Sequence, residues 1–284
     1  MPAYAAIAAA RSPQPAPPTF EVLGVRVDAV QIPEMIGRLE QWIAEGPRAR
    51  YVTLSNVHAI MEAQAQPAFK QALNQAASVC PDGMPLVWMG RRSGYAMPRR
   101  VYGPDLLWEF CRATQGKGYA HFFYGGGPGI APRLAAELRA RFPGLRVAGC
   151  YSPPFRPLSA EEDEAVAGMI NAAAPDLLWV GLGCPKQEYW MQEHAGRLRV
   201  PVMLGVGQAF DIYAGSLRQA PRWMREHGLE WLFRLCREPR RLGKRYLVYN
   251  SRFVAAAGRE WLFPVRKRNR QPAPAVLSDS EQPQ

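Results

Sequence analysis

The sequence predicts an α/β fold, in which a Rossmann-like and mostly parallel sheet has helices on both faces and a basic helical appendage follows. Short apolar runs, typical of fully buried strands, recur at intervals of about 24 to 32 residues. Amphipathic helical stretches fall between most of these runs, and strands that alternate with helices are joined by crossovers into a parallel sheet. A concentration of arginines near the C-terminus separates the appendage from the sheet.

The expected elements begin at Phe20. Residues 20–30 alternate well enough for a short hairpin, and Pro33 then opens an amphipathic helix. Strands are expected at residues 51–54, 77–80, 120–124, 146–150, 177–181 and 202–206. Helices are expected between them at residues 57–76, 104–115, 129–141, 159–173 and 185–195.

The C-terminal segment differs in charge. Residues 218–270 hold 15 Lys and Arg against 4 Asp and Glu, an excess of +11 that equals the net charge of the whole chain. Two helices are expected at 221–237 and 240–258, separated by Pro239, which lacks the N–H of a continuing helix. Tryptophans among the arginines are typical of helices that lie on anionic membranes. Contact with nucleic-acid phosphates is the alternative, although no helix-turn-helix or aromatic RNA-binding signature accompanies the charge.

Composition excludes several classes of protein. The chain is 48% hydrophobic and 21% charged, and its apolar runs are shorter than the roughly 18 residues of a spanning helix. Its five cysteines form no CxxC pair, which favours reduced thiols in a cytosol. We expect a disordered tail at 1–19, an α/β core at 20–216, the appendage at 217–263 and a second disordered tail at 264–284.

Glycines follow the predicted strand at 120–124 and precede a helix. Gly125, Gly126 and Gly127 either bring the backbone close to a phosphate at the helix N-terminus or form a plain tight turn. The next strand does not end in the acidic residue that a dinucleotide site uses for the ribose, so NAD binding is not expected.

Asp82 follows the predicted strand at 77–80 and precedes Gly83. Ligands of parallel sheets bind beyond the carboxyl ends of the strands, so this is where a catalytic carboxylate would lie. The alternative is a turn aspartate that bonds to its own backbone.

A second glycine turn, at Gly183, precedes the helix expected at 185–195. Helix capping explains Pro185 and Glu188 but not Lys186, because the helix dipole disfavours a lysine there. Lys186 is therefore a candidate phosphate contact, and the neighbouring Gln187 a candidate for sugar hydroxyls. Neither the histidines nor the aspartates have the spacing of metal ligands, so no metal and no cofactor are expected.

Taken in order, these segments resemble the WecG/TagA/CpsF glycosyltransferases, family 26, from about residue 20 to residue 246. The matching segments are Ser55-Asn56, Asp82-Gly83, Gly103–Leu106, Phe123–Gly126, Val180–Glu188, Gly205–Gly207, Phe210-Asp211, Ala220–Trp223 and Gly228–Trp231. The resemblance implies an inverting, metal-independent enzyme that moves a sugar from a UDP-sugar to a polyprenyl-diphosphate-linked sugar. The sugar would be N-acetylmannosamine, its uronic acid or glucose, and the pathway that of a bacterial surface polysaccharide or exopolysaccharide.

The resemblance also implies roles for single residues. Asp82 matches the proposed catalytic base of the family, and Asn56 and Gln187 match residues of its substrate pocket. The glycines at 125–127 and Gly183 would then face the nucleotide. Without a metal, arginines of the appendage are expected to hold a substrate diphosphate. They are Arg234, Arg237 and Arg241.

Two positions depart from the family pattern. The family often has Arg-Ala-Pro where this chain has Gln219-Ala220-Pro221, and commonly a small residue where this chain has Gln208. Both positions bear on the identity of the sugars.

The expected location is the cytoplasm, at the inner face of the cell membrane, where a peripheral enzyme would meet an anionic membrane surface. No nucleic acid is expected as a partner, and a homo-oligomer is left open. The alternative is a basic, Rossmann-like adaptor that binds membrane or nucleic acid and has no transferase activity.

Overall fold

The computed structural model describes residues 15–262, apart from the side chains of Arg241, Lys244 and Arg245 and those of residues 260–262. The predicted tail at 264–284 lies outside the described residues, as does most of the tail at 1–19.

The sheet has its strands in the order β4-β3-β8-β7-β5-β6, and every neighbouring pair is parallel, as the sequence predicts. Side chains of the central strands are buried on both faces, which explains their continuous apolar runs. The parallel arrangement brings all the carboxyl ends to one edge. The strands are β3 (Arg50–Ser55), β4 (Ser78–Pro81), β5 (Ala120–Gly125), β6 (Arg146–Tyr151), β7 (Leu177–Gly181) and β8 (Val202–Gly205).

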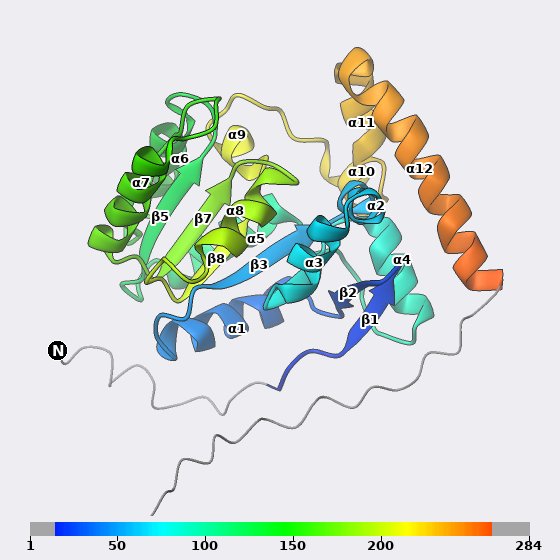
Figure 1. Ribbon diagram of the computed structural model, residues 1–284, viewed down its shortest axis with the longest axis horizontal. Coiled ribbons are helices and arrows are strands. Elements are labelled where there is room, and N and C mark those ends of the chain that lie inside the picture. The colour runs from blue at the N-terminus through cyan, green and yellow to red at the C-terminus, as the bar shows by residue number, and fades with distance from the viewer. Residues whose placement is uncertain (1–14, 263–284) are drawn as a thin grey trace, which may run out of the picture.

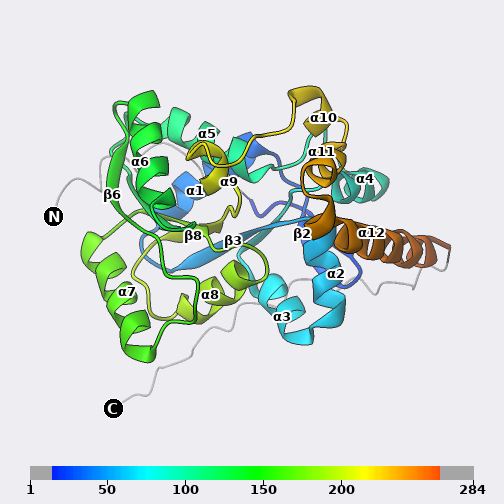
Figure 2. The ribbon, with the colours of Figure 1, turned by 90° about the horizontal axis from the view of Figure 1, so that it is seen from above.

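Helices cover both faces of the sheet (Figures 1 and 2). Each layer encloses its own apolar cluster of side chains. One layer contains α1 (Ile32–Ala44), α5 (Gly103–Thr114), α6 (Ile130–Arg141) and α9 (Ala209–Tyr213). The other contains α2 (Val57–Ala65), α3 (Pro67–Gln75), α7 (Ala160–Ala173) and α8 (Lys186–His194).

An antiparallel hairpin precedes the sheet and packs beside β4. Its strands are β1 (Thr19–Val22) and β2 (Val25–Asp28), and α4 (Met84–Arg92) lies against it. The buried hydroxyl of Ser78 donates to the Asp28 carboxylate at 2.5 Å, which fixes the hairpin to β4.

The appendage contains α10 (Arg222–Glu226), α11 (Glu230–Arg237) and α12 (Pro239–Leu262), and it lies beside α2 and α4 (Figure 1). Tyr249 of α12 donates its hydroxyl proton to Glu62 of α2 at 2.8 Å and stacks on the ring of His58. None of the helices in the described part of the chain is long and apolar enough to span a membrane.

The structure corrects two predicted helices. The helix expected at 57–76 is interrupted at Gln66, because Pro67 disfavours the helical conformation in the residue before it. The helix expected at 221–237 is likewise divided, at Gly228, whose φ of +73° is left-handed. The break predicted at Pro239 is confirmed, whereas α4 and α9 were not predicted.

Candidate active site at the carboxyl edge of the sheet

Asp82 lies directly after β4, at the seam between the core and the appendage. Its backbone N–H donates to the Ser55 carbonyl at the end of β3, at 2.8 Å. Its carboxyl group accepts a hydrogen bond from the backbone of Gly103 at the start of α5. The second carboxyl oxygen, Oδ1, is buried and has no hydrogen-bond partner among the described residues. This carboxyl group is therefore held by one hydrogen bond and keeps one unsatisfied acceptor oxygen.

Burial raises the pKa of Asp82 to about 7, because the charged form is stripped of water. The guanidinium of Arg100 opposes this rise, Glu230 adds to it, and Arg234 of α11 also lowers the pKa. A carboxyl group with a pKa near neutrality can take up and release a proton at physiological pH.

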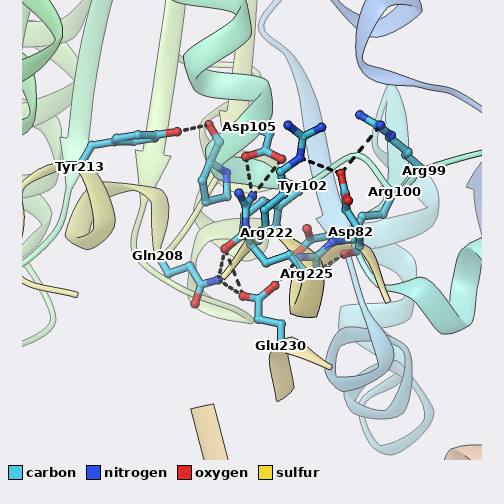
Figure 3. Close-up of polar contacts among 12 residues, drawn as sticks. Asp82, Arg99, Arg100, Tyr102, Asp105, Gln208, Tyr213, Arg222, Arg225 and Glu230 are labelled. Carbon is cyan, nitrogen blue, oxygen red and sulfur yellow. Dashed lines mark hydrogen bonds and ion pairs between the residues drawn. The ribbon is translucent and has the colours of Figure 1, made fainter. Parts of the chain in front are cut away.

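Glu230, the first residue of α11, connects the appendage to two loops of the core (Figure 3). Its carboxylate forms an ion pair with Arg100 and accepts a hydrogen bond from the Tyr102 hydroxyl at 3.1 Å. The side-chain amide of Gln208, which follows β8, donates to the same carboxylate at 3.2 Å. Arg100 also donates to the backbone carbonyl of Asp82 at 3.1 Å. The appendage is thereby tied to the backbone that carries the candidate base.

A second ion pair attaches α10 to the core. Arg225 reaches both carboxylate oxygens of Asp105, at 2.9 and 3.1 Å, near the start of α5. The Arg225 guanidinium also lies 5.5 Å from the centre of the Tyr102 ring. Both α10 and α11 are thus fixed to the segment between Arg100 and Asp105.

A small pocket of about 20 Å³ opens at this seam, between α9 and α11. Gln208 and Glu230 line it together with two of the three predicted arginines, Arg234 and Arg237. Arg241 belongs to α12, but its side chain lies outside the described part. Arg234 lies close enough to Asp82 to lower its pKa, and Arg237 lines the same pocket as Arg234, while binding of a diphosphate by these arginines stays a prediction.

The glycine turns lie further along the same edge and have structural reasons for being glycine. A Cβ atom added to Gly125 would lie 2.5 Å from the carbonyl carbon of Gly181, because β5 and β7 end in contact. One added to Gly126 would meet Ile130 at 2.6 Å, whereas one added to Gly183 would meet nothing within 4 Å. Close packing accounts for Gly125 and Gly126, and nucleotide contact stays a prediction for all four glycines.

The other predicted pocket residues divide into buried and exposed. Gln187 is buried, accepts from the Gly183 N–H at 3.2 Å and donates to Glu188 at 2.9 Å. Lys186 is exposed at the first turn of α8. Asn56 caps α2 by accepting from the Ala59 N–H at 3.3 Å. Their contacts with a substrate stay predictions.

Sequence reasoning missed several residues of this edge. Arg100 and Tyr102 belong to no motif, and Glu230 is in a matched segment but was given no role. Phe155, on the loop after β6, is 87% exposed, and its ring lies 3.4 Å from where Gly127 would place a Cβ atom. Ser152 fixes that loop by donating to the Gly125 carbonyl at 3.1 Å. No sequence spacing would have revealed this juxtaposition.

A larger hollow of about 770 Å³ lies on the far side of α9 and shares only Ile212 with the seam pocket. Its lining includes Trp108 and Tyr213, whose rings stack 5.3 Å apart, and it contains none of the predicted site residues. No cluster of three or more side chains able to hold a metal ion occurs among the residues that the structure describes.

Comparison of the sequence with known proteins shows the family to which this chain belongs. The chain is 26% identical, over 211 residues, to an N-acetylglucosaminyldiphosphoundecaprenol N-acetyl-beta-D-mannosaminyltransferase of Bacillus spizizenii, covering 74% of this chain and 80% of the relative. A protein of the same name from Staphylococcus aureus strain MW2 is 26% identical over 225 residues, or 79% and 87% of the two chains. The family match itself extends over residues 20–267. The chain therefore belongs to the glycosyl transferase WecG/TagA/CpsF family.

Proposed function

We propose that this enzyme transfers a sugar from a UDP-sugar to a sugar linked to a polyprenyl diphosphate, in the synthesis of a bacterial surface polysaccharide or exopolysaccharide. Family membership supports a glycosyltransferase over an adaptor without activity. The names of two relatives describe transfer of N-acetylmannosamine to N-acetylglucosaminyldiphosphoundecaprenol. N-acetylmannosamine is accordingly our first choice of donor sugar, ahead of its uronic acid and glucose.

The buried carboxyl group of Asp82 is the observation that carries the mechanism. We assign it as the general base, because its Oδ1 atom has no partner among the described residues and its pKa is about 7. An acceptor hydroxyl that donates to Oδ1 would lose its proton to Asp82 while its oxygen attacks the anomeric carbon. Attack occurs opposite the departing UDP, so a single displacement inverts the anomeric configuration.

The departing diphosphate gains negative charge, which positive groups must neutralise. Arg234 and Arg237 line the seam pocket, and guanidinium groups bind phosphate oxygens in pairs. We assign these two arginines, with Arg241, to a substrate diphosphate without a metal ion. If it belongs to the donor, their loss lowers kcat; if it belongs to the acceptor, their loss raises the KM of the acceptor.

The donor nucleotide is assigned to the edge formed by β5 and β7. The turn at 125–127 and Gly183 lie at this edge, and the start of α8 with Lys186 offers helix N–H groups and a positive charge for phosphates. The exposed ring of Phe155 beside Gly127 offers a flat apolar face on which a uracil base can stack.

The outer face of α12 supports contact with a membrane. Leu247 and Val254 are 74% and 69% exposed, and Arg252 on the same helix is also exposed. Apolar and basic side chains together favour an anionic bilayer surface. We assign the enzyme to the cytoplasmic face of the membrane, where its lipid-linked acceptor would lie.

Sedimentation with anionic vesicles tests this contact. The double variant Leu247→Asp/Val254→Asp should lose most of its vesicle binding, because two carboxylates replace inserted apolar groups. Met169→Asp, at an exposed position on α7, is the matched control and should bind like the wild type. Equal binding by all three proteins would remove α12 from the membrane contact.

The decisive experiment for the function measures UDP release. Purified protein is supplied with a panel of UDP-sugars and short-chain polyprenyl-diphosphate sugars, with and without EDTA. Release that depends on the acceptor and survives EDTA would establish the reaction and identify both sugars. Release abolished by EDTA would keep the transferase but overturn the metal-independent mechanism, and no release with any pair would contradict the proposed function.

A further inference from the structure

The side-chain amide of Gln208 is oriented by its neighbours in the seam pocket. Its Nε2 atom donates to the Glu230 carboxylate at 3.2 Å and to the Tyr102 hydroxyl oxygen at 3.4 Å. The Tyr102 hydroxyl gives its own proton to Glu230 at 3.1 Å, so its oxygen is the acceptor for Gln208. A carboxylate can only accept, so the nitrogen end of the amide must face Glu230 and the oxygen end must point the other way.

That oxygen is left without a partner. Gln208 Oε1 is buried from solvent, and no donor among the described residues bonds to it. An unsatisfied buried acceptor is costly, and the large majority of buried polar atoms have a partner. Gln208 lines the pocket of about 20 Å³, which is large enough for one hydroxyl-sized group.

The surroundings indicate which kind of group the pocket takes. Its positive charge comes from Arg218, Arg234 and Arg237, and it suits a diphosphate. Glu230 is already satisfied by three donors. The vacant partner of Oε1 must itself be a hydrogen-bond donor, since an amide oxygen only accepts. Saccharide hydroxyls and acetamido N–H groups are neutral donors carried next to a diphosphate.

We propose that Gln208 is a specificity-determining residue whose Oε1 atom accepts a hydrogen bond from a hydroxyl or acetamido N–H of a substrate sugar. Glu230 is its positioning residue, because it fixes the orientation of the amide. This inference rests on the proposed transferase function. The sugar is that of the donor or that of the acceptor, and the two sources are separated by the test below.

The test compares Gln208→Met with the wild type on matched pairs of substrates. Methionine keeps the length of the side chain but offers no amide oxygen. Each pair differs by one donor group, for example a sugar and its deoxy analogue, or an acetamido sugar and its hydroxyl counterpart, on the UDP-sugar or on the lipid-linked acceptor. For one pair, the wild type should have a kcat/KM roughly tenfold higher for the member that carries the donor group. In Gln208→Met the ratio of the two kcat/KM values should fall to about one.

The variant Glu230→Gln adds a second measurement. A glutamine at 230 can donate as well as accept, which releases the constraint on the Gln208 amide, so the same preference should weaken without any change in the residue that contacts the sugar. Gln192→Met is the matched control, since Gln192 bonds to Gln75 on the surface away from the pocket, and it should retain the full preference.

The outcomes separate the proposals. A preference that collapses for a donor-sugar pair assigns the pocket to the donor, and one that collapses for an acceptor pair assigns it to the acceptor. If Gln208→Met slows every substrate equally, the residue is only structural and the inference is wrong. If the wild type transfers sugar but Gln208→Met alters none of its preferences, the inference is wrong and the proposed function stands. If the wild type transfers no sugar, the proposed function is wrong.

Discussion

The carboxyl ends of β4 and β7 each bury an acidic side chain, and the two sites differ in their surroundings. Burial raises the pKa of Asp82 and that of Glu188 to about 7 in both cases. Around Asp82 lie the charges of Arg100, Glu230 and Arg234, of which the last two come from the appendage. Around Glu188, by contrast, the lowering contacts are hydrogen bonds from Gln187, from backbone and from Cys184.

The difference teaches that a raised pKa alone does not identify a catalytic carboxylate. Perturbed acids are common at functional sites, but burial in a helix start has the same effect. What distinguishes Asp82 is its place at the seam, close to Arg234 of a pocket that is lined by three arginines and so suits a diphosphate. We therefore propose that the chemistry takes place at the β4 end and that Glu188 has a structural role at the start of α8.

Replacing Asp82 by asparagine is the strongest test of this assignment. Asparagine keeps the shape of the side chain but cannot accept a proton, so turnover should fall by about 10²- to 10⁴-fold. Initial rates of UDP release measure the loss, and melting temperature shows whether the fold is intact. Full activity in Asp82→Asn would remove the base from the mechanism, and an equal loss in Glu188→Gln would erase the distinction between the two sites.

Removing the positive groups at the seam should have the next largest effect. The double variant Arg234→Gln/Arg237→Gln should lower transfer by roughly 10²-fold, because the diphosphate loses its neutralising charges. Arg112→Gln/Arg139→Gln is the matched control, with two exposed arginines of α5 and α6. Rates within twofold of the wild type for both double variants would show that the seam arginines do not act on substrate.

The sequence predicted the layers of this fold better than it predicted the seam. Apolar runs fix the strands because burial on both faces leaves no room for polar side chains, and all six strands of the sheet fall where expected. Asp82 was found from its place after a strand. The link from Arg100 through Glu230 to Gln208 was missed, because it joins residues up to 130 positions apart and depends on how α11 docks.

The appendage shows a second limit of sequence reasoning. Its amphipathic pattern indicated helices, yet Gly228 was not recognised as the point where one helix ends and the buried Glu230 begins the next. A charge count shows an excess of arginine but not that Arg225 already pairs with Asp105 of the core. Only the three-dimensional arrangement separates the arginines that attach the appendage from those that line the pocket.

The pH dependence of activity sharpens the comparison further. A base with a pKa of about 7 must be deprotonated to act, so kcat/KM should fall about tenfold per pH unit below 7 and level off above it. Rates measured between pH 5 and pH 9 test for this fall in kcat/KM, here called the acid limb of the pH profile. Glu188→Gln should retain it, whereas the residual activity of Asp82→Asn should not. If the acid limb persists in Asp82→Asn but vanishes in Glu188→Gln, then Glu188 is the base and Asp82 is not.

Stability measurements give the smallest effect and test the structural half of the comparison. The pKa of Glu188 is raised from 4.5 to about 7, so between these values the folded state holds a proton that the unfolded state has lost. The free energy of unfolding therefore falls as pH rises through this window, and the whole of this loss is present above pH 7. Glutamine carries no such deficit, so Glu188→Gln should be more stable than the wild type at pH 8, by at most about 3 kcal/mol, and unchanged at pH 4.

Urea unfolding at the two pH values checks this expectation, with the exposed Glu193→Gln of α8 as a control that should show no difference. Asp82→Asn should be stabilised at pH 8 for the same reason, since the pKa of Asp82 is raised in the same direction. The two variants would then agree in stability and differ in activity. If Glu188→Gln is instead less stable than the wild type at pH 8, the folded state stabilises the charged carboxylate of Glu188. Burial would then no longer explain the pKa of either acid.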